Sequence, residues 1–350
     1  MSDRSLCLLP KIQKVGGPGT FQKRLIAQAE KDGLVRIHFD PCEKDIGAFL
    51  IIGAPRRFLF CLIKARLKNI PVIQRLDGMN WVHRCQKSGI LYAIHSEMAN
   101  FSIAFYRRFI CSAIIYQSSF SQDWWNRVYG KVGRPETIIY NGTDLESFKP
   151  NSEEIPQDHI EVMLVEGNLS RGLDFGVKAA ISVVSALADR IQKKILLRIA
   201  GNVPKSVRES LRQHSDKISP LVSIIFTGVI DKEMLIRFER RSAFLISEEI
   251  NAACPNSVIE AMACGLPVIG FDTGSLKDVV GKGGIIVPYG NDPWKLENPI
   301  EEPLVQAAEK VIIDNRSFRV SARKQAELKY NISKMTQDYI DFCFSGVKQK

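Results

Sequence analysis

The sequence lacks the features that define membrane-spanning and secreted proteins. None of its apolar runs approaches the roughly 18 residues that a membrane-spanning helix requires. The longest runs, 48–52 and 58–63, end at glycine and lysine. The eight cysteines form no CxxC pair, and no signal-peptide core follows Met1. We therefore expect reduced thiols and a cytoplasmic protein.

Several chemical motifs are also missing. There is no GxGxxG fingerprint, which weighs against a dinucleotide-dependent oxidoreductase, and there is no Walker A loop. An Asp-x-Asp pair is absent, and the histidines are dispersed along the chain. The sequence thus offers no clustered metal ligands, and we expect chemistry that needs neither a metal ion nor a tightly bound cofactor.

The chain does carry an uneven distribution of charge along its length. Residues 1–150 hold 22 basic and 12 acidic side chains, whereas residues 151–350 hold 26 of each. No recognition module or repeated aromatic platform accompanies the excess, so we do not expect a nucleic-acid partner. Residues 56–68 mix large apolar side chains with five cations. They fit either peripheral contact with an anionic membrane surface or an ordinary helix with a solvated basic face.

Short apolar runs alternate with helical stretches, which is typical of doubly wound parallel sheets. A polar segment with two prolines, 149–158, interrupts the alternation, which then restarts. We expect a first domain at 1–150, a second at 151–325 and a C-terminal helix at 326–350 that could pack back on the first. The expected strands are 5–9, 48–52, 72–75, 113–116, 137–140, 161–165, 195–200, 222–226, 243–246 and 268–271.

Two segments could hold a ligand. Gly16 and Gly17 lie between a strand and a helix, where they fit either a phosphate or acceptor site or simply a tight turn. Glu260 follows Ser257 at capping-box spacing. It could accept two hydrogen bonds from a vicinal diol such as a ribose, or it could bond the N-cap amide. From spacing alone the capping box is favoured.

The run EAMACGLPVIGFDTGSLKDVV resembles the donor-site signature of the GT-B glycosyltransferases of family 4, in the subgroup that reads Pro-Asn before Val-Ile-Glu. Six further segments follow the family pattern in the same order along the chain: GGPGTFQKRL, RLDG, YQSSFS, YNGTDLESFKP, LLRIAG and FTGVI. The resemblance extends over nearly the whole chain. It implies a GT-B fold, in which two Rossmann-like domains of doubly wound parallel sheets face a cleft.

The resemblance also implies a retaining hexosyltransferase-type enzyme. It would move a sugar from a nucleoside diphosphate sugar to a hydroxyl of a glycan, lipid-linked or other acceptor. Glu260 would hold the ribose, and the amides of Asn256, Ser257 and Val258 would lie near the diphosphate. Gly16 and Gly17 would close over the phosphates. The donor would occupy the second domain and the acceptor the first.

The sequence departs from the family pattern at three places. Ala252 replaces the first of two family glutamates. Asn168 stands at one expected phosphate-binding cation, and Arg171 is a candidate for the other. Asp77 replaces a histidine and could accept a proton from the acceptor or hydrogen-bond the sugar, or it could be an Asp-Gly turn residue. His95 is a second acceptor-side candidate, with a core or surface histidine as the favoured alternative. These departures keep an epimerase-like enzyme or a degenerate nucleotide-sugar-binding protein as alternatives.

Overall fold

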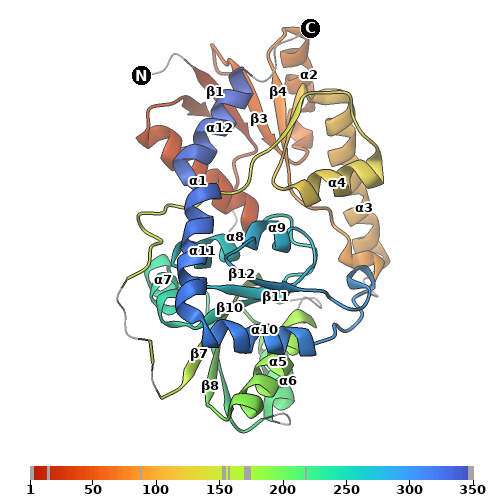
Figure 1. Ribbon diagram of the computed structural model, residues 1–350. Coiled ribbons are helices and arrows are strands. Elements are labelled where there is room, and N and C mark those ends of the chain that lie inside the picture. The colour runs from red at the N-terminus through yellow and green to blue at the C-terminus, as the bar shows by residue number, and fades with distance from the viewer. Residues whose placement is uncertain are drawn as a thin grey trace. The chain divides into compact units, whose positions relative to one another are not determined.

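The computed structural model describes residues 4–13, 16–86, 89–151, 155–156, 158–168, 175–216 and 219–345. Contacts within the chain divide it into two compact units, shown in Figure 1. The first unit combines the chain up to Gly142 with the chain from Tyr330 onward. The second unit comprises Thr143–Lys329. The first unit therefore ends before residue 150, where the polar segment suggested a boundary.

The sheet of the first unit is entirely parallel and has the strand order β2-β1-β3-β4-β5-β6. Strands β1, β3, β4 and β5 are buried along their whole length, which explains the apolar runs of β3 and β5, while β4 buries Gln74 and Arg75 as well. The strands are β1 (Ser5–Leu9), β2 (Arg36–His38), β3 (Ala48–Ile52), β4 (Val72–Leu76), β5 (Ala113–Tyr116) and β6 (Glu136–Ile138).

The C-terminal helix belongs to the first unit. Its Tyr339 ring lies 4.9 Å from the Phe21 ring of the first helix, and Gln28 Nε2 donates to Ser333 Oγ at 2.9 Å. The helices of this unit are α1 (Gly17–Lys31), α2 (Leu59–Leu67), α3 (Ile90–Phe105), α4 (Ser119–Tyr129) and α12 (Ile332–Phe344), with short helices η1 (Arg56–Phe58) and η2 (Val82–Arg84) and a π-helical turn, η3 (Tyr106–Ile110).

The second unit repeats the doubly wound architecture. Its parallel sheet has the order β12-β11-β10-β7-β8-β9. The strands are β7 (Ile160–Asn168), β8 (Ile195–Asn202), β9 (Val222–Gly228), β10 (Phe244–Ser247), β11 (Val268–Phe271) and β12 (Gly284–Val287). The helices are α5 (Phe175–Ile191), α6 (Lys205–Asp216), α7 (Lys232–Arg241), α8 (Asn256–Ala263), α9 (Leu276–Val280), η4 (Pro293–Lys295), α10 (Glu302–Ile313) and α11 (Asn315–Lys329). The two doubly wound parallel sheets expected from the sequence are confirmed.

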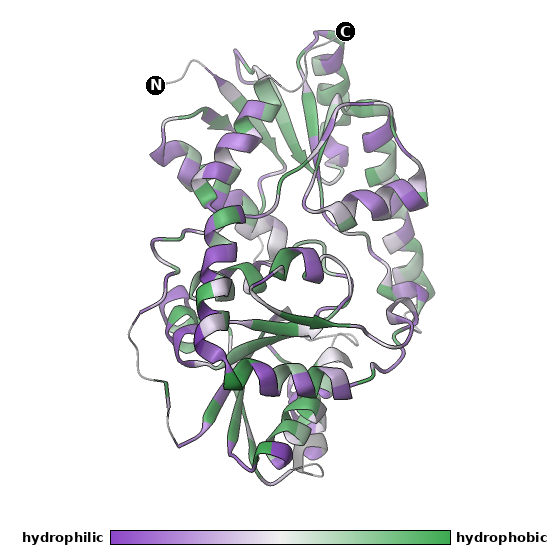
Figure 2. Ribbon diagram, viewed as in Figure 1, coloured by the Kyte–Doolittle hydropathy of each residue, from purple (hydrophilic) through white to green (hydrophobic). Residues whose placement is uncertain are grey.

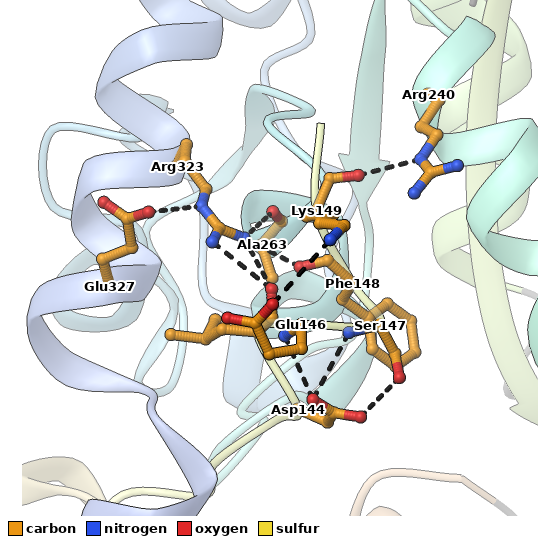
Figure 3. A network of polar contacts seen from close by, with 10 residues as sticks. Asp144, Glu146, Ser147, Phe148, Lys149, Arg240, Ala263, Arg323 and Glu327 are labelled. Carbon is orange, nitrogen blue, oxygen red and sulfur yellow. Dashed lines mark hydrogen bonds and ion pairs between the residues drawn. The ribbon is translucent and has the colours of Figure 1, made fainter. Parts of the chain in front are cut away.

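Hydrogen bonds from arginine side chains to backbone carbonyls explain why the second unit begins before residue 150. Figure 3 shows Arg323 of α11 donating to the carbonyl oxygens of Phe148, at 2.8 Å, and Ala263, at 2.7 Å. Arg240 Nε donates to the carbonyl of Lys149 at 2.8 Å. These arginines satisfy carbonyls of the connecting segment from within the second unit. In the described part of the chain, no helix has both the length and the apolar character needed to cross a membrane.

Candidate functional site

The second unit has a topological switch point between β7 and β10. These strands are neighbours, and the chain builds outward from them in opposite directions, through β8 and β9 on one side and β11 and β12 on the other. Open parallel sheets bind ligands outside the carboxyl ends of such a pair. Glu166 lies near the end of β7, and Glu248 directly follows β10.

Two glycines allow the segments at this point to approach closely. A Cβ on Gly201 of β8 would lie 1.6 Å from the carbonyl oxygen of Glu166, and Gly201 has a φ of +139°. A Cβ on Gly176 of α5 would lie 2.5 Å from the carbonyl oxygen of Glu248. Only glycine fits at these contacts. The ends of β7 and β8, the start of α5 and the segment after β10 therefore meet in one place.

Two carboxyl groups at the switch point, those of Glu248 and Glu166, have raised pKa values. Glu248 is buried, and its Oε1 has no hydrogen-bond partner among the described residues. Burial, with the nearby charges of Glu301 and Glu166, raises the pKa of Glu248 well above its usual range. Burial and the charge of Glu249 raise the pKa of Glu166 in the same way. A carboxyl that stays protonated can donate a hydrogen bond to a ligand.

The segment after β10 ends at the N-terminus of α8. Pro255 is the N-cap of this helix, and Asn256, Ser257 and Val258 are its first three residues. The amides at these positions have no acceptor within the helix and lie at the positive end of its dipole. The preceding loop is held by a hydrogen bond from the Ser275 amide to the Ala252 carbonyl, at 2.9 Å. This helix end is suited to an anion.

The capping box favoured by spacing is wrong. The helix begins two residues earlier than a cap at Ser257 requires, and its N-cap residue, Pro255, has no polar side chain that could cap the helix. Glu260 is therefore the fifth helical residue and lies beyond the first turn, which contains no acidic residue. Its side chain is buried. A role for Glu260 in capping no longer competes with a ligand role.

In the first unit, Gly16 is the N-cap of α1, and Gly17 is the first helical residue. Gly16 has a φ of +145°, which side-chain-bearing residues rarely adopt. Gly17 carries no such requirement, and a Cβ there would find no described atom within 4 Å. A tight turn explains Gly16 but does not explain Gly17. Space therefore remains beside the first amides of α1.

Asp77, which directly follows β4, belongs to a closed ring of four side chains. Arg75 donates to Asp77 Oδ1 and, at 3.1 Å, to Asn141 Oδ1. Asn141 Nδ2 donates to Gln117 Oε1 at 3.0 Å, and Gln117 Nε2 donates to Asp77 Oδ1. Arg75 is only 1% exposed and lies 3.8 Å from the centroid of the Phe21 ring. Asp77 is thus the counter-ion of a buried guanidinium, which neither sequence interpretation of this residue anticipated.

His95 lies on the exposed side of α3, away from the buried residues Ser96 and Asn100. It is a surface histidine of the first unit. The structure does not bring it into the ring around Asp77. Its predicted acceptor-side role stays a prediction.

Comparison with known proteins identifies the second unit. Residues 161–304, which lie within the second unit, match the domain model described as "Glycosyl transferases group 1". A D-inositol 3-phosphate glycosyltransferase from Catenulispora acidiphila is 22% identical over 179 residues, or 48% of this chain and 42% of that protein. The chain spans about half the length of the curated relatives it matches.

Solved structures show the fold of the whole chain. Sucrose-phosphate synthase from Thermosynechococcus elongatus matches with a TM-score of 0.69 at 15% identity, covering 96% of this chain and 97% of that chain. HepE from Anabaena, solved with UDP and glucose, matches with a TM-score of 0.66 at 13% identity, covering 97% and 98%. The two parallel sheets are those of the GT-B fold, as the resemblance implied.

The group 1 domain contains most of the predicted donor residues. Asn256, Ser257, Val258 and Glu260 lie together on α8. Asn168 is the last residue of β7, at the switch point, and pairs with Asn202 of β8. Arg171 lies outside the described residues. No group of three or more His, Cys, Asp or Glu side chains that could hold a metal ion is found within the described ranges.

The raised pKa of Glu248 predicts a pH-dependent stability. Between the ordinary glutamate pKa of about 4.3 and its raised value, the folded protein binds more protons than the unfolded chain. Stability therefore falls as the pH rises through this window. Glu248→Gln removes the titration and is expected to raise the melting temperature by a few degrees at pH 8 and to leave it nearly unchanged at pH 4.5. An equal shift at both pH values, in scanning calorimetry, would contradict the assignment.

Proposed function

We propose that this chain is a retaining glycosyltransferase. It moves a sugar from a nucleoside diphosphate sugar to a hydroxyl of a glycan, lipid-linked or other acceptor. The observation that carries the proposal is the place of α8 in the group 1 domain, since its N-terminus follows β10 of the switch pair. The likeness to HepE, which was solved with UDP and glucose, supports a nucleotide sugar as donor.

The donor contacts follow from the chemistry of the leaving group. A departing nucleoside diphosphate develops negative charge, which oriented amides and a helix dipole stabilise. We assign this role to the amides of Asn256, Ser257 and Val258, with Asn168 and Arg171 as further contacts. The Glu260 carboxylate accepts a hydrogen bond from each of the two ribose hydroxyls. In the first unit, the amides at Gly16 and Gly17 offer the same kind of contact to phosphate.

Retention requires that the acceptor hydroxyl attack from the face that the phosphate leaves. The bond between the anomeric carbon and the phosphate oxygen breaks as the bond to the acceptor oxygen forms, and the departing phosphate oxygen takes the hydroxyl proton. No protein nucleophile enters this step. Asp77 stays the acceptor-side candidate of the first unit, with its carboxylate oriented by Arg75 and Gln117.

The transfer is expected to proceed without a divalent cation. Oriented amides and basic side chains supply the charge stabilisation that a metal ion would otherwise give. Turnover of the nucleotide sugar should therefore be the same, within about twofold, with EDTA and with added Mg²⁺ or Mn²⁺. Turnover that disappears on chelation and returns with the metal would refute a metal-free mechanism.

A nucleotide screen tests the proposed function. Thermal unfolding of the full chain is followed with UDP, GDP, ADP and CMP, and with NAD and DNA as controls. One nucleoside diphosphate is expected to raise the melting temperature, because a ligand that binds only the folded state stabilises it. Stabilisation by NAD or DNA alone would refute the proposal. NMR of the corresponding nucleotide sugar after incubation separates transfer from epimerisation.

A further inference from the structure

Helix α3 has its apolar face turned outward. Leu91, Met98 and Phe101 recur at helical spacing and are 81%, 53% and 66% exposed. The residues that α3 buries are Ser96, Asn100 and Ala104, which are polar or small. An ordinary surface helix shows the reverse pattern. This arrangement leaves a large apolar area in contact with solvent.

Specific polar contacts fix this orientation. Asn100 Oδ1 accepts from the Asn80 amide at 3.0 Å, and Asn100 Nδ2 donates to the Asn80 carbonyl at 2.8 Å. Arg56 Nη2 donates to the Met98 carbonyl at 3.1 Å and to Ser102 Oγ at 2.7 Å. Rotating α3 to bury its apolar side chains would break these bonds. The exposed face is therefore part of the folded structure of the unit.

Neighbouring elements extend the apolar surface. Phe60 and Leu67 of α2 are 84% and 80% exposed, and Phe109 of η3 packs its ring 5.1 Å from that of Phe105. Both α2 and α3 contact η3, and Figure 2 shows hydrophobic residues recurring along both helices. We define the apolar face as Phe60, Leu67, Leu91, Met98, Phe101 and Phe109. Large exposed apolar side chains gathered on contacting elements in this way mark interaction surfaces.

The charges around this face are almost all positive. Residues 51–110 contain ten lysines and arginines and two acidic residues, Asp77 and Glu97. Asp77 pairs with Arg75, and Glu97 pairs with Arg84 at 2.6 Å and with His83 at 2.9 Å. Both carboxylates are thus neutralised locally. The surplus, which includes the exposed residues Arg57, Lys64, Lys68 and Arg108, attracts anionic surfaces.

We propose that the apolar face docks the first unit on an anionic lipid bilayer. Phenylalanine, leucine and methionine side chains enter the interfacial layer, while lysine and arginine extend along it to the phosphate headgroups. A second copy of the chain fits less well, because it would bring the same cations to the interface. The proposal concerns binding alone and does not depend on sugar transfer. The proposed membrane-contact surface includes α3 in addition to residues 56–68, where the sequence offered peripheral membrane contact as one interpretation.

Vesicle flotation of the full-length chain tests this proposal. The vesicles are phosphatidylcholine alone or with a third of phosphatidylglycerol, each at low and high salt. Binding is expected to need the anionic lipid and to weaken with salt. Two triple variants, one apolar-to-serine and one charge-reversed, should each lose about tenfold or more in partitioning. The variants are Leu91→Ser with Met98→Ser and Phe101→Ser, and Arg57→Glu with Lys64→Glu and Lys68→Glu.

Matched variants on the second unit separate docking from general surface effects. They change side chains that are exposed, as those of the first-unit variants are, and they should bind vesicles as the wild type does. Melting curves establish that every variant is folded. The controls are Val229→Ser with Ile313→Ser and Leu328→Ser, and Lys193→Glu with Lys282→Glu and Lys310→Glu. Binding that ignores phosphatidylglycerol, or that survives both first-unit variants, would overturn the proposal. So would a lipid-free dimer in analytical ultracentrifugation that the serine variant converts to monomer.

Discussion

Replacing Asp77 with asparagine is expected to lower the free energy of unfolding by about 3 kcal/mol. The reason is Arg75, which is 1% exposed and would lose its only carboxylate partner in the ring. Removing one member of a buried ion pair leaves an uncompensated charge. Because the Asp77 side chain is 31% exposed, water screens part of the effect, so the lower end of the usual range applies. Urea unfolding of the two proteins measures the difference.

A double variant supplies the control for this prediction. Arg75→Leu combined with Asp77→Asn removes both charges and should recover most of the lost stability, since an apolar side chain tolerates this site better than an unpaired guanidinium. Wild-type stability of Asp77→Asn alone would refute the counter-ion role. A stable Asp77→Asn protein with abolished turnover would instead favour the predicted acceptor-side role of Asp77, in which it hydrogen-bonds the acceptor or the sugar.

The second large effect concerns Glu260. Glu260→Gln is expected to weaken the affinity for the nucleoside diphosphate by about 10- to 100-fold, since hydrogen bonds to a charged group contribute roughly 1.5–3 kcal/mol. The amide keeps the shape of the side chain but removes the charge, and it offers one acceptor oxygen where the carboxylate offers two. Titration calorimetry with the full-length chain measures the affinity.

Glu233→Gln, on the exposed first turn of α7, is the matched control and should leave the affinity unchanged. Melting curves of both variants establish that they are folded. A folded Glu260→Gln protein that binds the nucleotide as tightly as the wild type would remove Glu260 from the donor site. The capping box offers no competing explanation, because α8 begins at Asn256.

The sequence predicts the parallel sheets well because strand and helix periods are local signals. Buried strands such as β3 and β5 appear as continuous apolar runs. The edge strand β2 was missed because its three residues include Arg36 and His38, and the edge strand β12 was missed although its four residues are apolar. The N-cap of α8 was misplaced by two residues, at Ser257, for a physical reason. Asn256 and Ser257 are both good caps, and spacing cannot show that Pro255 already occupies the N-cap position.

Contacts between distant segments account for most of what the sequence analysis missed. Gln117 and Asn141 lie far from Asp77 in the chain, and the parallel pairing of β4, β5 and β6 brings them to it and to its neighbour Arg75. The only early signal was a charged residue inside a buried strand. Helix α3 is a similar case, because its apolar stripe predicts a helix but not which side faces the core. That choice depends on the pairing of Asn100 with Asn80.

Hydrogen exchange tests whether the N-terminus of α8 binds the diphosphate. The full-length chain is saturated with the nucleoside diphosphate that the screen identifies, and exchange is followed by mass spectrometry. We expect slower exchange in the peptide that contains Asn256, Ser257 and Val258, since these amides would donate to the phosphates. Peptides from α10, on the same unit, should be unchanged. Saturating binding that leaves the α8 peptide unprotected would refute a diphosphate site at this helix end.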